Sequence, residues 1–301
     1  MKVLLAIDGS EHSEEAAWLF SHLPHEDKLE ITVVTVINIS IGNESSITPK
    51  DWMKEIGTRE RNTAVKAYEK IAAMFEGANA QTQHVIREGY VGETIVTEAE
   101  KIGAEMVVLG ARGHSTVGRI LLGSTSDFVA THAPCSVFVV RPTGLRKEPD
   151  RPLRVAVGYD DSGPSLSAVA QFKEFRWGPQ TELHVVTVVP SPSAYFIDFA
   201  VDLNEYNEAS AAALEQVANK LREVAPNLQS HVIESEHIGE GLVRFIAGQR
   251  CDMIVMGDTN RNLLGRMLLG SASRFVLRHA SCSVWVTRNR PISNEKTNSD
   301  K

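Results

Sequence analysis

The sequence predicts an α/β protein of two tandem, doubly wound domains, each built around a parallel sheet. Short runs of aliphatic and β-branched residues alternate with longer stretches of helical periodicity, which is the order typical of strand–helix–strand units. The whole order then occurs a second time: Asp8 in "VLLAIDGS" matches Asp160 in "VAVGYDDS", 152 positions later. Repetition of such a long unit indicates two copies of one domain rather than a solenoid of short repeats.

Strands and helices alternate regularly in the first half of the chain. The predicted strands are 2–8, 30–37, 81–87, 105–109 and 136–140, and the predicted helices are 11–21, 52–76, 91–103 and 124–132. Runs such as "MVVL" are apolar throughout instead of alternating with polar residues. Such strands are expected in a parallel sheet that helices cover on both faces.

The second half repeats the strands of the first. They are predicted at 153–159, 181–189, 228–234, 252–256 and 283–287. Matching positions lie 152 residues apart at first and 147 residues apart from His84 and His231 onward, so the first copy has five extra residues, in a loop rich in Gly, Asn, Ser and Pro. We predict domain 1 at 1–142, a proline- and charge-rich linker at 143–150, domain 2 at 151–290 and a flexible tail at 291–301.

The composition disfavours several classes of partner. The 301 residues carry a net charge of -7 with the acid spread along the chain, so no nucleic-acid partner is expected. No apolar run is long enough to cross a membrane, and the first residues lack the features of a signal peptide. The three cysteines form no CxxC motif, which disfavours zinc and disulfides. We therefore expect a cytoplasmic protein and predict no metal-ligating residues.

The segment "GARGHSTVGRILLGST", residues 110–125, has the composition of an anion-binding loop. It starts directly after a predicted strand and ends where a helix should begin, with Ser124 as a good N-cap. A first helical turn offers unpaired N–H groups and partial positive charge, and glycines let the main chain approach an oxyanion. The alternative is a glycine-rich turn that only joins strand to helix. The residues of the predicted cradle are Gly110, Arg112, Gly113, Arg119, Gly123 and Ser124.

Asp8 ends the first predicted strand, where a carboxylate without a partner would be costly. Two roles are open to it. It can accept hydrogen bonds from a base amino group or a ribose, or it can cap the first helix, because "DGSEHSEEA" is typical of a helix start. Asp160 presents the same choice in the second copy.

The spacing of these glycines and the following serine, together with "VLLAIDGS", resembles the ATP-binding branch of the universal stress protein family. The resemblance covers both halves along their whole length. It implies an adenine nucleotide alpha hydrolase-like fold, with five parallel strands in the order 3-2-1-4-5 in each domain. It also implies bound ATP with Mg²⁺ or Mn²⁺, and pairing of the fifth strands, within this chain or in a homodimer. The implied ATP contacts are Ala6, Asp8, Val36, Leu109, Gly110, Gly113, Gly123, Ser124 and Thr125.

The second copy of the glycine loop departs from the pattern. Asn260 replaces the second glycine, while Asp258 and Thr259 replace Ala111 and Arg112, so the loop is two charge units more negative. At a water-screened site, a misplaced charge at about 4 Å costs on the order of 1 kcal/mol. We predict that domain 1 binds ATP well and that domain 2 binds it weakly or not at all. The residues of the weaker site are Asp160, Val188, Gly257, Asn260, Gly270 and Ser271.

The expected function is that of an ATP-binding regulatory protein of the stress response. No catalytic residue is predicted, because the sequence has no P-loop lysine and no assigned nucleophile or general base. Two alternatives stay open: an enzyme with slow ATP hydrolysis or autophosphorylation near Ser124, and an interaction scaffold that binds no nucleotide. Phosphate release tests the first, and adenine absorbance of the purified protein tests the second.

Overall fold

The computed structural model describes residues 1–37, 50–113, 122–191, 203–258 and 269–288. The strands are β1 Lys2–Ala6, β2 Leu29–Ile37, β3 Ala80–Glu88, β4 Met106–Gly110, β5 Ser136–Val140, β6 Arg154–Gly158, β7 Glu182–Pro190, β8 Leu228–Ser235, β9 Met253–Gly257 and β10 Ser283–Thr287. The helices are α1 Glu11–Ser21, α2 Lys50–Ala73, α3 Val91–Ile102, α4 Ser124–His132, α5 Gly163–Phe172, α6 Leu203–Leu221, α7 Ile238–Gly248 and α8 Ser271–His279, with a short 3-10 helix, η1, at Leu145–Lys147. The predicted element order is confirmed.

Each half of the chain has the strand order that the family resemblance implies. In the first half β3, β2, β1, β4 and β5 lie side by side, and every neighbouring pair is parallel. The second half repeats this as β8, β7, β6, β9 and β10. The chain therefore reverses direction around the sheet at β1 and β4 in the first half, and at β6 and β9 in the second.

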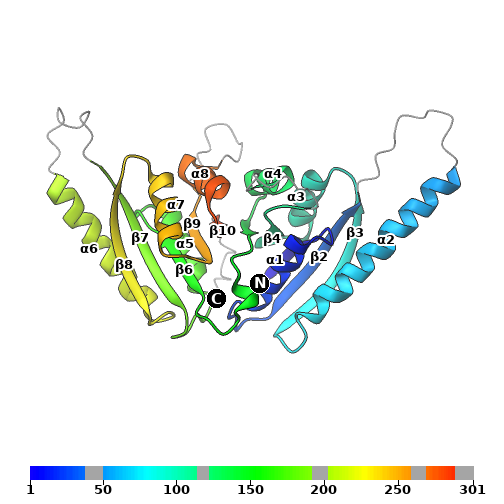
Figure 1. Cartoon of the computed structure of the whole chain (residues 1–301), viewed down its shortest axis with the longest axis horizontal. Helices are drawn as coiled ribbons and strands as arrows, with labels where there is room; N and C mark the ends of the chain where they lie inside the picture. Colours follow the sequence, from blue (N-terminus) through cyan, green and yellow to red (C-terminus); the bar gives the residue numbers. More distant parts are fainter. Residues whose placement is uncertain (38–49, 114–121, 192–202, 259–268, 289–301) are drawn as a thin grey trace, which may run out of the picture.

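The two half-sheets are continuous. β5 pairs antiparallel with β10, with Phe138 opposite Trp285, so the described strands form one ten-stranded sheet. Figure 1 shows the two halves on either side of this junction, with α2 and α6 at the two outer ends. No helix in the described part of the chain has the length and hydrophobicity of a membrane span.

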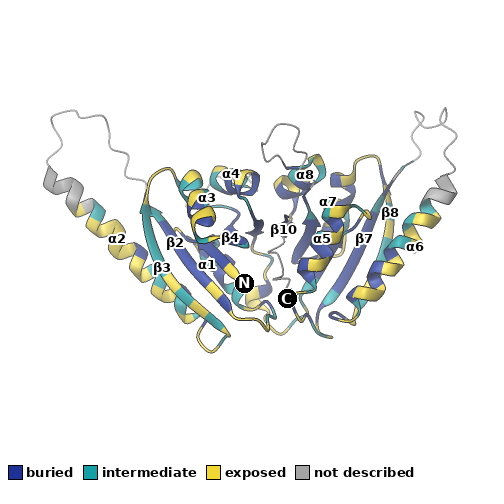
Figure 2. Cartoon of the chain, turned by 180° about the vertical axis from the view of Figure 1, so that it is seen from behind, coloured by how far each residue is buried: buried dark blue, intermediate teal, exposed yellow. Residues whose placement is uncertain are grey.

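Helices cover both faces of the sheet, which explains the apolar strands. Val3 and Leu5 of β1 face a core cluster with α1, α2, α5 and α6, whereas Leu4 and Ala6 face a second cluster with α3, α4, α7 and α8. Both clusters contain residues of both halves, so the hydrophobic core passes through the junction. Figure 2 shows the inner strands, such as β1 and β2, buried along most of their length, whereas the edge strand β3 is intermediate or exposed.

The linker between the two halves is fixed by specific contacts. Leu145 of η1 is buried in the core, and Arg146 lies 3.8 Å from Glu15 of α1. Arg151 and Thr143 both bind the buried Asp252 carboxylate, each with a contact of 2.6 Å to Oδ1. The predicted tail, 291–301, lies outside the described residues.

Two neighbouring histidines in the second half, the buried His184 and the half-buried His231, predict a dependence of stability on pH. His184 Nδ1 lies 3.1 Å from His231 Nε2, and Phe245 packs against both rings. Burial lowers the pKa of both, and the His231 imidazole lowers the pKa of His184 further. The folded protein therefore binds fewer protons than the unfolded chain. This stability is complete above the unfolded pKa of about 6.5 and is lost as the pH falls below it.

We expect the free energy of unfolding in urea to fall from about pH 7.5 to about pH 5, and His231→Gln to reduce the fall. His237→Gln, which changes an exposed histidine of the same half, should leave the fall unchanged. An equal pH dependence in wild type and His231→Gln would contradict the assignment to this pair.

Candidate functional site

A cavity opens where β1 and β4 end, at the carboxyl edge of the first half-sheet. β1 and β4 are neighbours, with Ala6 opposite Leu109, so Asp8 and the glycine loop after β4 meet at one edge. The cavity has a volume of about 380 Å³, within the range typical of small-molecule sites. Its lining residues are Ala6, Ile7, Asp8, Ser13, Val34, Val36, Val91, Ile95, Leu109, Gly110, Arg112, Gly113, Gly123, Ser124, Thr125 and Ser126.

Every predicted contact of the first site that lies in the described residues lines this cavity. One predicted contact, Arg119, lies outside the described residues. One part of the lining is aliphatic, with Ala6, Val36 and Ile95, and another carries the glycines and hydroxyl groups at the start of α4. Such a cavity suits a flat apolar group attached to a polar, anionic one.

Two glycines are required by the close approach of neighbouring atoms. A Cβ at Gly110 would lie 2.7 Å from the carbonyl oxygen of His12, in the first turn of α1. A Cβ at Gly113 would lie 2.5 Å from Asp8 Oδ2. Real Cβ atoms do not make contacts this short, so a side chain at position 113 would displace the Asp8 carboxylate or the loop.

The start of α4 differs from the prediction that Ser124 is its N-cap. Gly123 is the N-cap, in extended conformation, and no side chain caps the helix. Ser126 Oγ instead donates to the carbonyl oxygen of Gly110 at 2.8 Å, which ties the first turn of α4 to the end of β4. Ser124 and Thr125 are therefore residues of the first helical turn, and both line the cavity. The free amides of a first turn favour anion binding.

Asp8 is not the N-cap of α1, so it does not take the capping role that the sequence left open for it. The N-cap is Ser10, whose Oγ accepts from the Ser13 amide at 3.3 Å. Asp8 Oδ1 accepts from the Ser10 amide at 3.0 Å and from Ser10 Oγ at 2.6 Å. Asp8 thus supports the cap with one oxygen, while Oδ2 is directed toward Gly113 and the cavity.

Six lining residues were missed by sequence reasoning: Ile7, Ser13, Val34, Val91, Ile95 and Ser126. Val91 and Ile95 are one turn apart on α3, whose helix was predicted at 91–103. Their place at the cavity followed only from the packing of α3 over the ends of β1 and β2.

Comparison with known proteins identifies the chain. The profile described as "Universal stress protein family" matches residues 1–141 and again residues 153–288. The chain belongs to the universal stress protein family.

A relative of similar length, a shorter one and a solved structure support this assignment. The universal stress protein Rv2005c of Mycobacterium tuberculosis is 28% identical over 298 residues, which cover 95% of this chain and 96% of the relative. YxiE of Bacillus subtilis is 28% identical over 145 residues and matches 46% of this chain with 98% of its own length. The crystal structure of a universal stress protein from Archaeoglobus fulgidus has a TM-score of 0.62 at 23% identity, covers 96% of this chain with 97% of its own, and supports the fold.

The second half of this universal stress protein has a much smaller cavity at the matching edge. Its volume is about 80 Å³, and larger residues line it: Tyr159 stands where the first half has Ile7, and Met256 where it has Leu109. The predicted contacts Asp160, Val188 and Gly257 line this cavity, whereas Gly270 and Ser271 do not. Asn260 lies outside the described residues.

Asp258 takes a different position from the one that its charge suggested. Its side chain is buried, with Oδ2 3.2 Å from Arg288 Nε and Oδ1 accepting from the Gly270 amide at 3.0 Å. The negative charge expected beside a triphosphate is therefore paired with arginine. Arg288 could not be found as the partner because it lies at the end of another strand.

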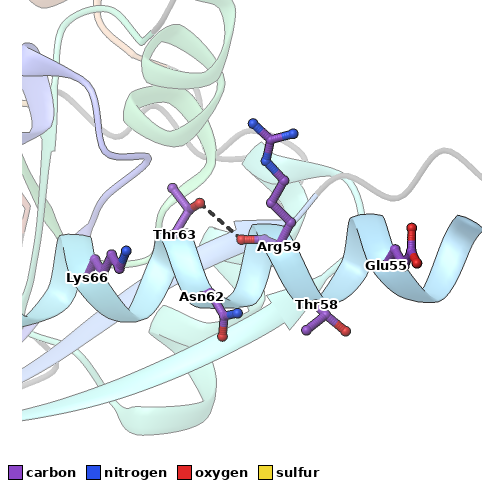
Figure 3. A pocket seen from close by; sticks show the side chains of 6 residues that line it. All are labelled: Glu55, Thr58, Arg59, Asn62, Thr63 and Lys66. Carbon is purple, nitrogen blue, oxygen red and sulfur yellow. Dashed lines mark hydrogen bonds between the residues drawn. The ribbon is translucent and has the colours of Figure 1, made fainter.

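A second hollow of this universal stress protein, of about 530 Å³, runs along α2. It is lined by Glu55, Thr58, Arg59, Asn62, Thr63 and Lys66, shown in Figure 3. Thr63 Oγ1 donates to the carbonyl oxygen of Arg59, one turn earlier, at 3.0 Å. Because one helix supplies all six residues, they do not converge on a common point, and the cavity at β1 and β4 is the better candidate site.

Proposed function

We propose that this universal stress protein binds ATP in its first half and acts as a nucleotide-dependent regulator in the stress response. One observation carries the proposal: the cavity at the ends of β1 and β4 joins an aliphatic pocket to the uncapped start of α4. Adenine is a flat group that aliphatic residues can enclose, and a triphosphate is the kind of anion that helix amides and glycine loops bind.

Each part of the cavity has a role in this proposal. Ala6 and Val36 enclose the base, and Asp8 accepts a hydrogen bond from the ribose or the adenine amino group. The amides of Gly113 and the first turn of α4 hold the phosphates. Where the structure describes the chain, no three His, Cys, Asp or Glu side chains gather as metal ligands. Mg²⁺ or Mn²⁺ would therefore arrive bound to the phosphates, as is usual for Mg²⁺ with nucleotides.

The second half is proposed to bind ATP weakly or not at all. Its cavity of about 80 Å³ is well below the size typical of ligand sites, which is about 300–1,000 Å³. Ile238 and Met256 also narrow the cavity of the second half, because they stand where the first half has the shorter side chains of Val91 and Leu109.

The cavity favours binding over catalysis. The described lining residues supply hydroxyl groups from four serines and threonines and the carboxylate of Asp8, but no histidine or lysine as a general base. One oxygen of the Asp8 carboxylate already accepts hydrogen bonds from Ser10. Slow hydrolysis or autophosphorylation remains the alternative, to be tested by phosphate release. We also propose a cytoplasmic location. Because β5 and β10 pair with each other, a homodimer would need a different surface from the fifth strands.

The deciding experiment is to identify the nucleotide released from purified protein by mass spectrometry and to measure ATP affinity by calorimetry. Asp8→Ala is expected to lower the affinity by about tenfold or more, since hydrogen bonds to charged groups contribute about 1.5–3 kcal/mol.

Asp160→Ala is a closely matched control. Asp160 Oδ1 accepts from the Ser162 amide and hydroxyl as Asp8 does from Ser10, so both variants lose the same support for a helix cap. ATP affinity should be unchanged in Asp160→Ala. Equal losses in the two variants, or wild-type protein that binds no ATP, would contradict the proposal.

A further inference from the structure

Two arginines cross the junction between the halves in matching ways. Arg141 follows β5 and Arg288 follows β10, and both are at least 95% buried. Arg141 donates to the carbonyl oxygens of Leu277 at 2.6 Å and Cys282 at 3.3 Å, at the end of α8 and beyond it. Arg288 donates in the same way to Ala133 and Cys135, beyond the end of α4. Each guanidinium thus satisfies carbonyl groups at the negative end of a helix in the other half.

The two arginines differ in their acidic partner. Arg288 Nε forms an ion pair with Asp258. Arg141 Nε is buried and has no hydrogen-bond partner among the described residues. The residue that corresponds to Asp258 in the first half is Ala111, which carries no charge. One buried guanidinium is therefore neutralised by a side chain, whereas among the described residues the other contacts carbonyl groups alone.

A second positive charge, that of Arg112, lies near Arg141. Burial, together with repulsion from Arg112, which lines the cavity, lowers the pKa of Arg141 to about 10, against an opposing effect of Cys282. His12 lies nearby, with its Nδ1 buried and likewise without a partner in the described chain. Burial and Arg112 also lower the pKa of His12, against the opposing effects of Asp8 and Glu11. An anion near Arg141 would relieve this repulsion.

The internal repeat shows where such an anion would act. In the second half the Asp258 carboxylate bridges Arg288 Nε and the Gly270 amide. The corresponding groups of the first half are Arg141 Nε and the Gly123 amide, and Gly123 lines the cavity. In the first half the Gly123 amide donates to the carbonyl oxygen of Ala111 at 2.7 Å. Arg141 therefore lies behind the part of the loop that faces the proposed phosphates.

We propose that the phosphates of the bound nucleotide are the counter-charge of Arg141, and that the residue at positions 111 and 258 determines which half accepts a nucleotide. The inference rests on the proposed function. Because Ala111 is uncharged, the positive electrostatic potential of Arg141 extends to the cavity. In the second half the Asp258 carboxylate neutralises Arg288. Arg141 acts through its electrostatic field and through the loop, and it does not line the cavity. It is therefore a specificity-determining residue rather than a direct ligand of the nucleotide.

The test compares calorimetric affinities for ATP and adenosine in full-length Arg141→Met and Arg141→Lys. Because only ATP carries phosphates, Arg141→Met should lower the ATP affinity about tenfold or more and change the adenosine affinity less than about twofold. Arg141→Lys keeps the charge and should recover most of the ATP affinity. Equal losses for ATP and adenosine in Arg141→Met would show a purely structural role and overturn the proposal.

A second pair of variants acts at position 111. Ala111→Asp should pair with Arg141, raise the thermal midpoint of the ligand-free protein, and lower the ATP affinity by about 100-fold. Ala111→Asn has nearly the same size without the charge, and should keep more of the ATP affinity than Ala111→Asp. Wild-type ATP affinity in Ala111→Asp would overturn the inference, as would equal losses in the two variants.

Inorganic tripolyphosphate separates this inference from the proposed function. If wild-type protein binds tripolyphosphate in an Arg141-dependent way but binds neither adenosine nor ATP, the nucleotide proposal fails and the role of Arg141 stands. If ATP binds and its affinity is independent of Arg141, the proposed function stands and the inference fails. If neither ATP nor tripolyphosphate binds, both fail.

Discussion

Gly113→Asp is expected to lower the ATP affinity of the first half by at least about 100-fold. The new Cβ would lie 2.5 Å from Asp8 Oδ2, so the loop or Asp8 must move. The new carboxylate would then stand beside Asp8 and face the phosphates, and a like charge at about 4 Å costs about 4 kcal/mol at an effective dielectric constant of 20. Steric displacement and charge repulsion act in the same direction.

Calorimetry with Mg²⁺–ATP measures the effect, and circular dichroism verifies that the variant is folded. Gly57→Asp adds the same side chain to α2, where an added Cβ meets no atom within 4 Å, and should bind ATP like wild type. Gly113→Asp with wild-type affinity would refute the placement of the phosphates at this loop. A loss of similar size in Gly57→Asp would instead indicate a general effect of added charge.

Trp285→Ala is expected to lower the free energy of unfolding by about 3–5 kcal/mol, the range for large aromatic residues in protein cores. Trp285 is fully buried on β10, with ring centroids 6.3 Å from Phe138 and 5.5 Å from Phe175. Phe138 lies opposite it on β5, so the residue packs across the junction of the two halves. The cavity left by alanine would lie in the core that both halves share.

Trp285→Phe should cost much less. The indole Nε1 is buried without a hydrogen-bond partner in the described residues, so phenylalanine removes an unsatisfied polar group along with part of the ring. Urea unfolding followed by circular dichroism measures both variants. Trp18→Ala, on α1 and partly exposed, is the control for losing a tryptophan outside the junction. A loss in Trp285→Ala no greater than in Trp18→Ala would contradict the role of this residue.

The fold was predictable because its determinants are local or repeated. Strands such as 106–109 are apolar on both faces, and the offset between the halves is constant over long stretches, so the sequence indicated two covered parallel sheets. The strand order 3-2-1-4-5 came from the family resemblance, and the register confirms it. Strand ends were less accurate: β1 stops at Ala6, because Asp8 turns to support the Ser10 cap instead of extending the strand.

The site was predictable as far as single loops determine it. Asp8 and the glycines meet because β1 and β4 are neighbours. The glycine spacing indicated the loop, and the carboxylate at the end of an apolar strand indicated Asp8. The prediction of Ser124 as the helix cap was wrong. The hydrogen bond from Ser126 Oγ to the Gly110 carbonyl oxygen fixes the first turn of α4, which begins one residue earlier than expected. The pairing of Asp258 with Arg288 depends on two strand ends that are distant in sequence, so local patterns do not contain it.

The covalent connection of the halves permits an asymmetry that two identical subunits do not have. In a symmetric dimer of single domains, an alanine-to-aspartate change after the fourth strand would appear in both subunits. It would then neutralise the charge of both guanidinium groups. Here β5 and β10 join two different copies, so Asp258 can neutralise Arg288 while Arg141 keeps its charge. One chain can thus combine a half whose buried arginine is paired within the protein with a half that we propose to bind the nucleotide.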